Sequence, residues 1–91
     1  MTQLEEIGLR LSRIRSSKGV SRRELSDAIG YSETSIYLWE TGKAAISVLA
    51  LRRFCEYFRV GSEWILFGSA KGEKRVKTIR PSKNSARIPS L

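Results

Sequence analysis

The chain has 91 residues, a formal net charge of +8 and no histidine, which is room for one small domain and a tail. Its 41% hydrophobic and 29% charged residues are typical of a globular protein, and no apolar run approaches the roughly 18 residues of a membrane helix. With Cys55 as the one cysteine, a Cys/His zinc site, a Ser-His-Asp triad and a Cys-His pair are excluded from this chain alone. We therefore expect a basic binding module without metal or cofactor, and the lack of a signal-peptide core predicts a cytoplasmic location.

Apolar residues recur at helical spacing through residues 1–68, where polar caps and glycines mark out five predicted helices. Two capping boxes, Thr2 with Glu5 and Ser21 with Glu24, open the first and second helices. Serines at positions 32 and 47 open the third and fourth, and glycines at 19, 30 and 42 end the first three. The positions predicted to face inward are Ile7, Leu11, Ile14, Leu25, Ala28, Ile29, Ile36, Trp39, Val48, Leu51, Phe54, Cys55 and Phe58.

A last short helix is predicted over Trp64, Ile65 and Phe67, after the break at Val60-Gly61-Ser62. A domain this small buries only about 60% of the surface of its unfolded chain. The two tryptophans and three phenylalanines are therefore expected to carry much of the stability. No strand is indicated in this part of the chain.

Only Gly30 and Tyr31 separate the second helix from the cap of the third, which is the spacing of a helix-turn-helix. Residues 22–43, RRELSDAIGYSETSIYLWETGK, resemble the DNA-binding unit of the lambdoid phage repressor and Cro family, also called the Xre type. Gly30 can take the positive φ of the turn, and the apolar positions that lock the two helices together are Leu25, Ile29, Ile36 and Trp39. The resemblance covers about residues 7–68 and implies an all-α, five-helix, lambda-repressor-like DNA-binding domain over residues 1–68.

Three positions depart from the family pattern without breaking the fold. Arg22 stands where the family usually has glutamine, Tyr31 where the turn usually carries valine or isoleucine, and Ile46 where proline is frequent. The first departure bears on DNA binding, because a glutamine that bridges phosphate and adenine becomes a cation suited to phosphate or guanine.

The resemblance implies that the outward face of the third helix enters the major groove. Ile36, Trp39 and Glu40 are predicted to point toward the domain, and the candidate base-contacting residues on the opposite face are Glu33, Thr34, Tyr37 and Leu38. The alternative is a solvated face, but an exposed tyrosine and leucine beside a tight turn favour a contact surface.

Candidate phosphate-contacting residues surround this helix, and they are Arg22, Arg23, Ser32, Thr41 and Lys43. Arg52, Arg53 and Arg59 allow either a phosphate contact or a solvated face. The resemblance also implies a partly buried ion pair between Arg15 and Glu40 that supports the recognition helix. Removing one partner should cost about 3 to 5 kcal/mol if the pair is buried and about 1 kcal/mol or less if it is exposed.

Residues 69–91 differ in composition from the rest and are predicted to form a basic, flexible tail. They hold seven Lys and Arg against one Asp or Glu, or +6, whereas residues 1–68 hold ten against eight, or +2. We favour a disordered polycation that adds non-specific DNA affinity; the alternatives are an arm in the minor groove and a dimerisation strand over residues 75–79. Truncation after Gly68 would then weaken binding to all sequences alike.

These observations predict a sequence-specific transcriptional regulator, a repressor that binds an inverted repeat of double-stranded DNA as a homodimer. Apolar or neutral positions left over after assignment of the core are candidates for the dimer interface: Ile46, Leu49, Tyr57, Ser62 and Leu66. A Cro-like protein, a short prophage repressor, a restriction-modification controller and an antitoxin would share this pattern.

Two other classes of function are less well supported. A protein-interaction module, such as an antitoxin that neutralises a toxin partner, need not keep a polar recognition face flanked by cations. An enzyme is remote, because the carboxylates Glu24 and Asp27 lie on a short helix with no cleft to hold a substrate. For Cys55 the predicted role is that of a small buried hydrophobic residue, with a redox switch as the alternative.

Overall fold

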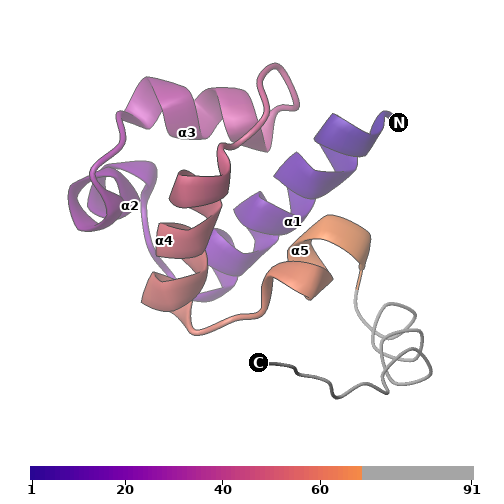
Figure 1. Ribbon diagram of the computed structural model, residues 1–91. Helices are drawn as coiled ribbons and strands as arrows, with labels where there is room; N and C mark the ends of the chain where they lie inside the picture. The colour runs from indigo at the N-terminus through magenta and orange to yellow at the C-terminus, as the bar shows by residue number, and fades with distance from the viewer. Residues whose placement is uncertain (69–91) are drawn as a thin grey trace, which may run out of the picture.

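The computed structural model describes residues 1–68, which form five α-helices and no strand, as predicted. The helices are α1 (Gln3–Ser17), α2 (Arg22–Ile29), α3 (Glu33–Glu40), α4 (Val48–Phe58) and α5 (Ser62–Phe67). Figure 1 shows α2 and α3 at one end of the domain, with α5 beside the long α1 at the other. The predictions for the tail, including the strand over residues 75–79, lie outside the described residues.

The first four helices begin where their capping residues predict, whereas α5 begins at Ser62, inside the predicted break and without a side-chain cap. In α1, the Glu5 backbone N–H donates to Thr2 Oγ1 (3.1 Å) and the Thr2 N–H donates back to Glu5 Oε1 (2.8 Å). Ser21 and Glu24 form the same reciprocal box at α2. The bond from the Thr2 N–H lowers the pKa of Glu5. A lowered pKa means that this cap stabilises the folded chain above the ordinary carboxyl pKa and is lost as the pH falls through the lowered one.

One core joins all five helices. Its most completely buried large side chains come one from each helix, in chain order Leu11, Leu25, Ile36, Phe54 and Ile65. Because each such side chain contributes about 1.5 to 3 kcal/mol on burial, none of the helices is stable without the others.

Two inward-facing predictions, Val48 and Ala28, are wrong. Val48 is 86% exposed, because the buried stripe of α4 is Ala50, Phe54 and Phe58 and Val48 lies two residues before it, on the opposite face. Ala28 is exposed because Leu25 and Ile29 take the inner face of α2. Leu51 and Cys55 are half-buried beside the α4 stripe.

The aromatic contribution to the core is also smaller than predicted. Phe67 is 61% exposed at the end of α5, and Trp64 is half-buried. Trp64 nevertheless packs against the buried core cluster, whereas Phe67 does not belong to it. Of the five predicted aromatics, Trp39, Phe54 and Phe58 are buried, Trp64 packs against them at the edge of the core, and Phe67 is exposed.

Arg59 ends α4 in a conformation that favours glycine, with φ 58° and ψ 49°. Replacing Arg59 with glycine should therefore stabilise the domain by about 0.5 to 1 kcal/mol, since relief of the left-handed strain exceeds the added entropy of the unfolded chain. Arg52→Gly, inside α4, is the matched control and should destabilise by about 1 kcal/mol. Urea unfolding of both variants checks the sign; equal destabilisation would contradict the strain at Arg59.

Candidate nucleic-acid interface

The turn between α2 and α3 has the geometry that its sequence predicts. Gly30 adopts φ 80° and ψ 28°, in the left-handed region, and its N–H donates to the Ser26 carbonyl (3.0 Å). Ser32 then starts α3, its hydroxyl accepting the Ser35 N–H at 3.0 Å. Because the connection is so short, the angle between α2 and α3 depends on the conformation of Gly30 and on the side chains that contact Tyr31.

Tyr31 packs against both the inner face of α3 and an arginine of α4. Its ring meets Trp39 edge to face, with centroids 5.4 Å apart, which explains how the turn accommodates an aromatic residue. The Arg53 guanidinium lies 5.9 Å from the Tyr31 ring centroid and donates through Nη1 to the Ile29 carbonyl (3.2 Å). Arg53, although exposed, therefore supports the end of α2, a role that its sequence position left open.

Glu40, at the end of α3, accepts hydrogen bonds from two arginines. Arg15 of α1 donates through Nε to Oε2 (2.6 Å) and through Nη2 to Oε1 (3.1 Å), while Arg22 of α2 donates through Nε to Oε1 (2.9 Å). The Glu40 side chain is 3% exposed, against 13% for Arg15 and 40% for Arg22. The ion pair implied by the sequence resemblance is thus one part of a triad that ties three helices together.

Of the four side chains expected on the outward face of α3, three are exposed and one is half-buried. Glu33 and Thr34 are exposed at the first turn, and Tyr37 is 42% exposed in the middle of the helix. Leu38 is half-buried, and its carbonyl accepts the N–H groups of Lys43 and Ala44 as the chain leaves α3. Three of the four candidate base-contacting side chains therefore form an accessible surface.

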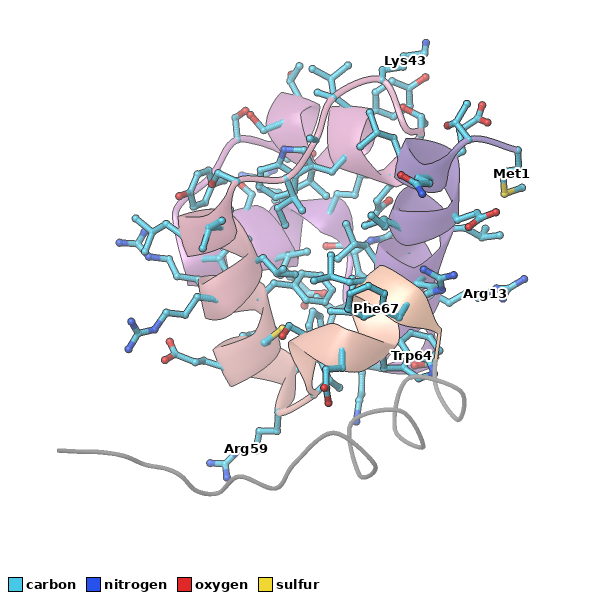
Figure 2. The ribbon with its side chains drawn as sticks, turned by 45° about the vertical axis from the view of Figure 1, so that its right-hand side comes forward. Met1, Arg13, Lys43, Arg59, Trp64 and Phe67 are labelled. Atoms are coloured by element: carbon cyan, nitrogen blue, oxygen red, sulfur yellow. The ribbon has the colours of Figure 1, made fainter. Side chains whose placement is uncertain are left out.

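The candidate phosphate-contacting residues include exposed cations and hydroxyls that already form hydrogen bonds within the domain. Arg23 and Lys43 are exposed. The Ser32 hydroxyl donates to Ser35 Oγ (3.0 Å) and the Thr41 hydroxyl to the Tyr37 carbonyl (2.8 Å), so both protons already have partners. Figure 2 places Lys43 at the top of the domain and Arg59 at the bottom, which puts Arg59 on a different surface from α3.

A comparison with protein families decides the class of this domain. Residues 6–63 match the family described as a helix-turn-helix domain. The chain belongs to this helix-turn-helix family. Its fold is similar to the crystal structure of the clp gene regulator ClgR from C. glutamicum, with a TM-score of 0.67 and 22% identity over 90% of this chain and 99% of that chain. No curated protein matches the sequence.

Four of the five candidate dimer residues are exposed on the last two helices of this helix-turn-helix domain. Leu49, Tyr57, Ser62 and Leu66 are exposed on α4 and α5, whereas Ile46 is half-buried and packs against the core. Two further apolar side chains are exposed on the same two helices, Val48 and Phe67, and the sequence pattern had placed Val48 inside. Among residues 1–68, no helix is long and apolar enough to cross a membrane and no acidic, Cys or His cluster could hold a metal ion.

Cys55 packs at the edge of the core of the helix-turn-helix domain, where burial raises the pKa of its thiol. A raised pKa lowers the fraction of reactive thiolate at neutral pH. We expect a thiol reagent to label the native protein several-fold more slowly than the urea-unfolded chain at the same pH. Equal labelling rates would favour the redox alternative.

Two contacts between residues far apart in the chain were not predicted from the sequence. The pairing of Arg22 with Glu40 joins residues 18 positions apart, and Arg53 reaches Ile29 across 24. The one available signal for Arg22 was its departure from the usual glutamine, which indicated a changed contact but not its partner.

Proposed function

We propose that this chain is a sequence-specific DNA-binding transcription regulator that represses by occupying its operator, with α3 in the major groove of double-stranded DNA. One observation carries the proposal: α3 is fixed by its inner face and presents a polar outer face between cations. Ile36, Trp39 and Glu40 are buried, while Glu33 and Thr34 are exposed. A helix-turn-helix reads bases with the N-terminal part of its second helix, where these two side chains lie.

The exposed side chains of α3 suit base edges. The Glu33 carboxylate can accept a hydrogen bond from the amino group of cytosine, and Thr34 can contact a thymine methyl group or a base edge. Arg22, Arg23 and Lys43 flank the helix and suit the phosphates on either side of the groove. Residues 1–68 carry only +2, so discrimination between sequences depends on these few side chains, and the +6 of residues 69–91 aids encounter.

A homodimer supplies the specificity that one short helix lacks. Eight residues of α3 reach few base pairs, and paired half-sites about one helical turn apart, or a multiple of it, are the usual solution. The exposed apolar residues of α4 and α5, such as Leu49, Tyr57 and Leu66, are the surface we propose for pairing. Sedimentation of Leu49→Asp and Tyr57→Asp variants, compared with wild type, tests this surface.

Selection of binding sites from random duplex DNA, followed by titration of the selected duplex and of a scrambled one at two salt concentrations, tests the function. The selected duplex should bind about 10³-fold or more tightly than the scrambled one. Glu33→Ala should relax the preference at one base pair, and Arg23→Ala should weaken both duplexes alike. A ratio below about ten for the wild type would contradict sequence-specific regulation.

The alternative is a protein-interaction module such as an antitoxin, and the exposed apolar side chains of α4 and α5 are what favours it. It predicts a weak sequence preference together with tight binding of a toxin encoded by a neighbouring gene. Measuring both affinities separates it from regulation by DNA binding alone.

A further inference from the structure

Two cations lie against the same aromatic ring on the recognition helix. The Arg22 guanidinium carbon is 5.3 Å from the centroid of the Tyr37 ring, and Lys43 Nζ is 5.6 Å from it. Both distances are within the roughly 6 Å at which a cation is attracted to the face of a ring. Arg22 begins α2 and Lys43 follows the end of α3, so Tyr37 links residues from both sides of the recognition helix.

Each of the two side chains is also held by a hydrogen bond near its base or at one nitrogen, and the remaining N–H donors of its charged group stay available. Arg22 gives its Nε proton to Glu40, and among residues 1–68 its Nη groups have no hydrogen-bond partner. The Lys43 backbone N–H donates to the Leu38 carbonyl at 2.9 Å, which fixes the base of the side chain, while within the described residues Nζ forms no ion pair. A hydrogen bond and the Tyr37 ring thus hold both residues in place, and N–H donors of both cations remain available to a ligand.

We infer that Tyr37 is a positioning residue that orders Arg22 and Lys43 for two DNA phosphates, instead of reading a base. The inference rests on the proposed DNA binding. Long arginine and lysine side chains lose rotamer freedom when they bind phosphate, and a ring that orders them beforehand removes part of that cost. The cations also occupy the π-system of Tyr37, which reduces the surface that the ring can offer to a base.

The test compares Tyr37→Ala and Tyr37→Phe on the duplex selected by the wild type and on a scrambled duplex, over a range of salt concentrations. Tyr37→Phe keeps the ring and should bind within about twofold of wild type. Tyr37→Ala should weaken both duplexes about tenfold at low salt. The slope of log K against log salt should become shallower by about 1 to 2, since each lost phosphate contact contributes about 0.9.

A double variant supplies the matched control. In Arg22→Gln/Lys43→Gln, the glutamine at position 22 retains a donor for Glu40, but the cations are gone. Adding Tyr37→Ala to this background should change the affinity less than twofold, because the ring no longer has cations to position. Because Tyr37 is half-exposed and outside the core, the urea midpoint of Tyr37→Ala should stay near that of wild type. Tyr37→Leu replaces it if the alanine variant fails to fold.

Three results would overturn the inference while leaving the proposed function intact. Tyr37→Ala could change the preference at one base pair with an unchanged salt slope, which would make Tyr37 a base reader. Tyr37→Phe could lose as much affinity as Tyr37→Ala, which would assign the effect to the hydroxyl. Tyr37→Ala could also leave binding to both duplexes unchanged. A wild-type protein that fails to bind the selected duplex would instead overturn the proposed function and this inference together.

Discussion

Replacing Glu40 with alanine should lower the free energy of unfolding by about 3 to 5 kcal/mol. Glu40 is the shared acceptor of Arg15 and Arg22, and its removal leaves two positive charges close together with no carboxylate between them. Most of this cost comes from Arg15, because its side chain is only 13% exposed and water cannot fully replace the lost carboxylate as its partner. Urea unfolding of the variant and wild type at neutral pH measures the difference.

Two further variants separate this triad from an ordinary surface pair. Arg15→Ala should cost about 3 kcal/mol, at the lower end of the range for a buried pair, because Glu40 keeps Arg22 as its partner. Glu56→Ala removes an exposed pair with Arg52, 3.2 Å apart, and should change stability by less than about 1 kcal/mol. An Arg15→Ala midpoint that hardly differs from wild type would contradict a buried triad.

Replacing Gly8 with alanine should destabilise the domain by about 3 kcal/mol and displace α3. A Cβ at Gly8 would lie 2.3 Å from the Trp39 carbonyl oxygen and 2.7 Å from that of Glu40. These are backbone atoms, which no rotamer change can move, so α1 and the end of α3 must separate. The variant should therefore also lose affinity for the selected duplex. Unfolding and DNA titration of the same preparation measure both effects.

Gly61→Ala is the matched control for this substitution. A Cβ at Gly61 has no neighbour within 4 Å, and its φ of −82° suits any residue. Its cost should stay below about 1 kcal/mol, the loss expected when alanine replaces glycine at the start of a helix. Equal effects at Gly8 and Gly61 would contradict the close packing of α1 on α3 at Gly8.

The starts of the first four helices and the tight turn could be predicted from the sequence because the interactions that define them are local, whereas α5 has no side-chain cap to mark its start. The hydroxyls of Thr2 and Ser21 bind N–H groups three residues ahead, and Gly30 needs only its own φ. The inner faces of the helices were harder to predict at their borders. Ala28 and Val48 fit a helical spacing, but the core accepts a narrower stripe than the spacing allows.

By itself, the sequence determined the fold class, the helix-turn-helix and the position of α3, because caps, a glycine turn and apolar periodicity act within a few residues. Only the tertiary structure decided that Arg22 shares Glu40 with Arg15, that Arg22 and Lys43 both lie near the Tyr37 ring and that Gly8 is a point of close contact of α1 with α3. These relations join residues on different elements. They depend on the angle and distance at which helices cross, which the side chains of the whole core set together.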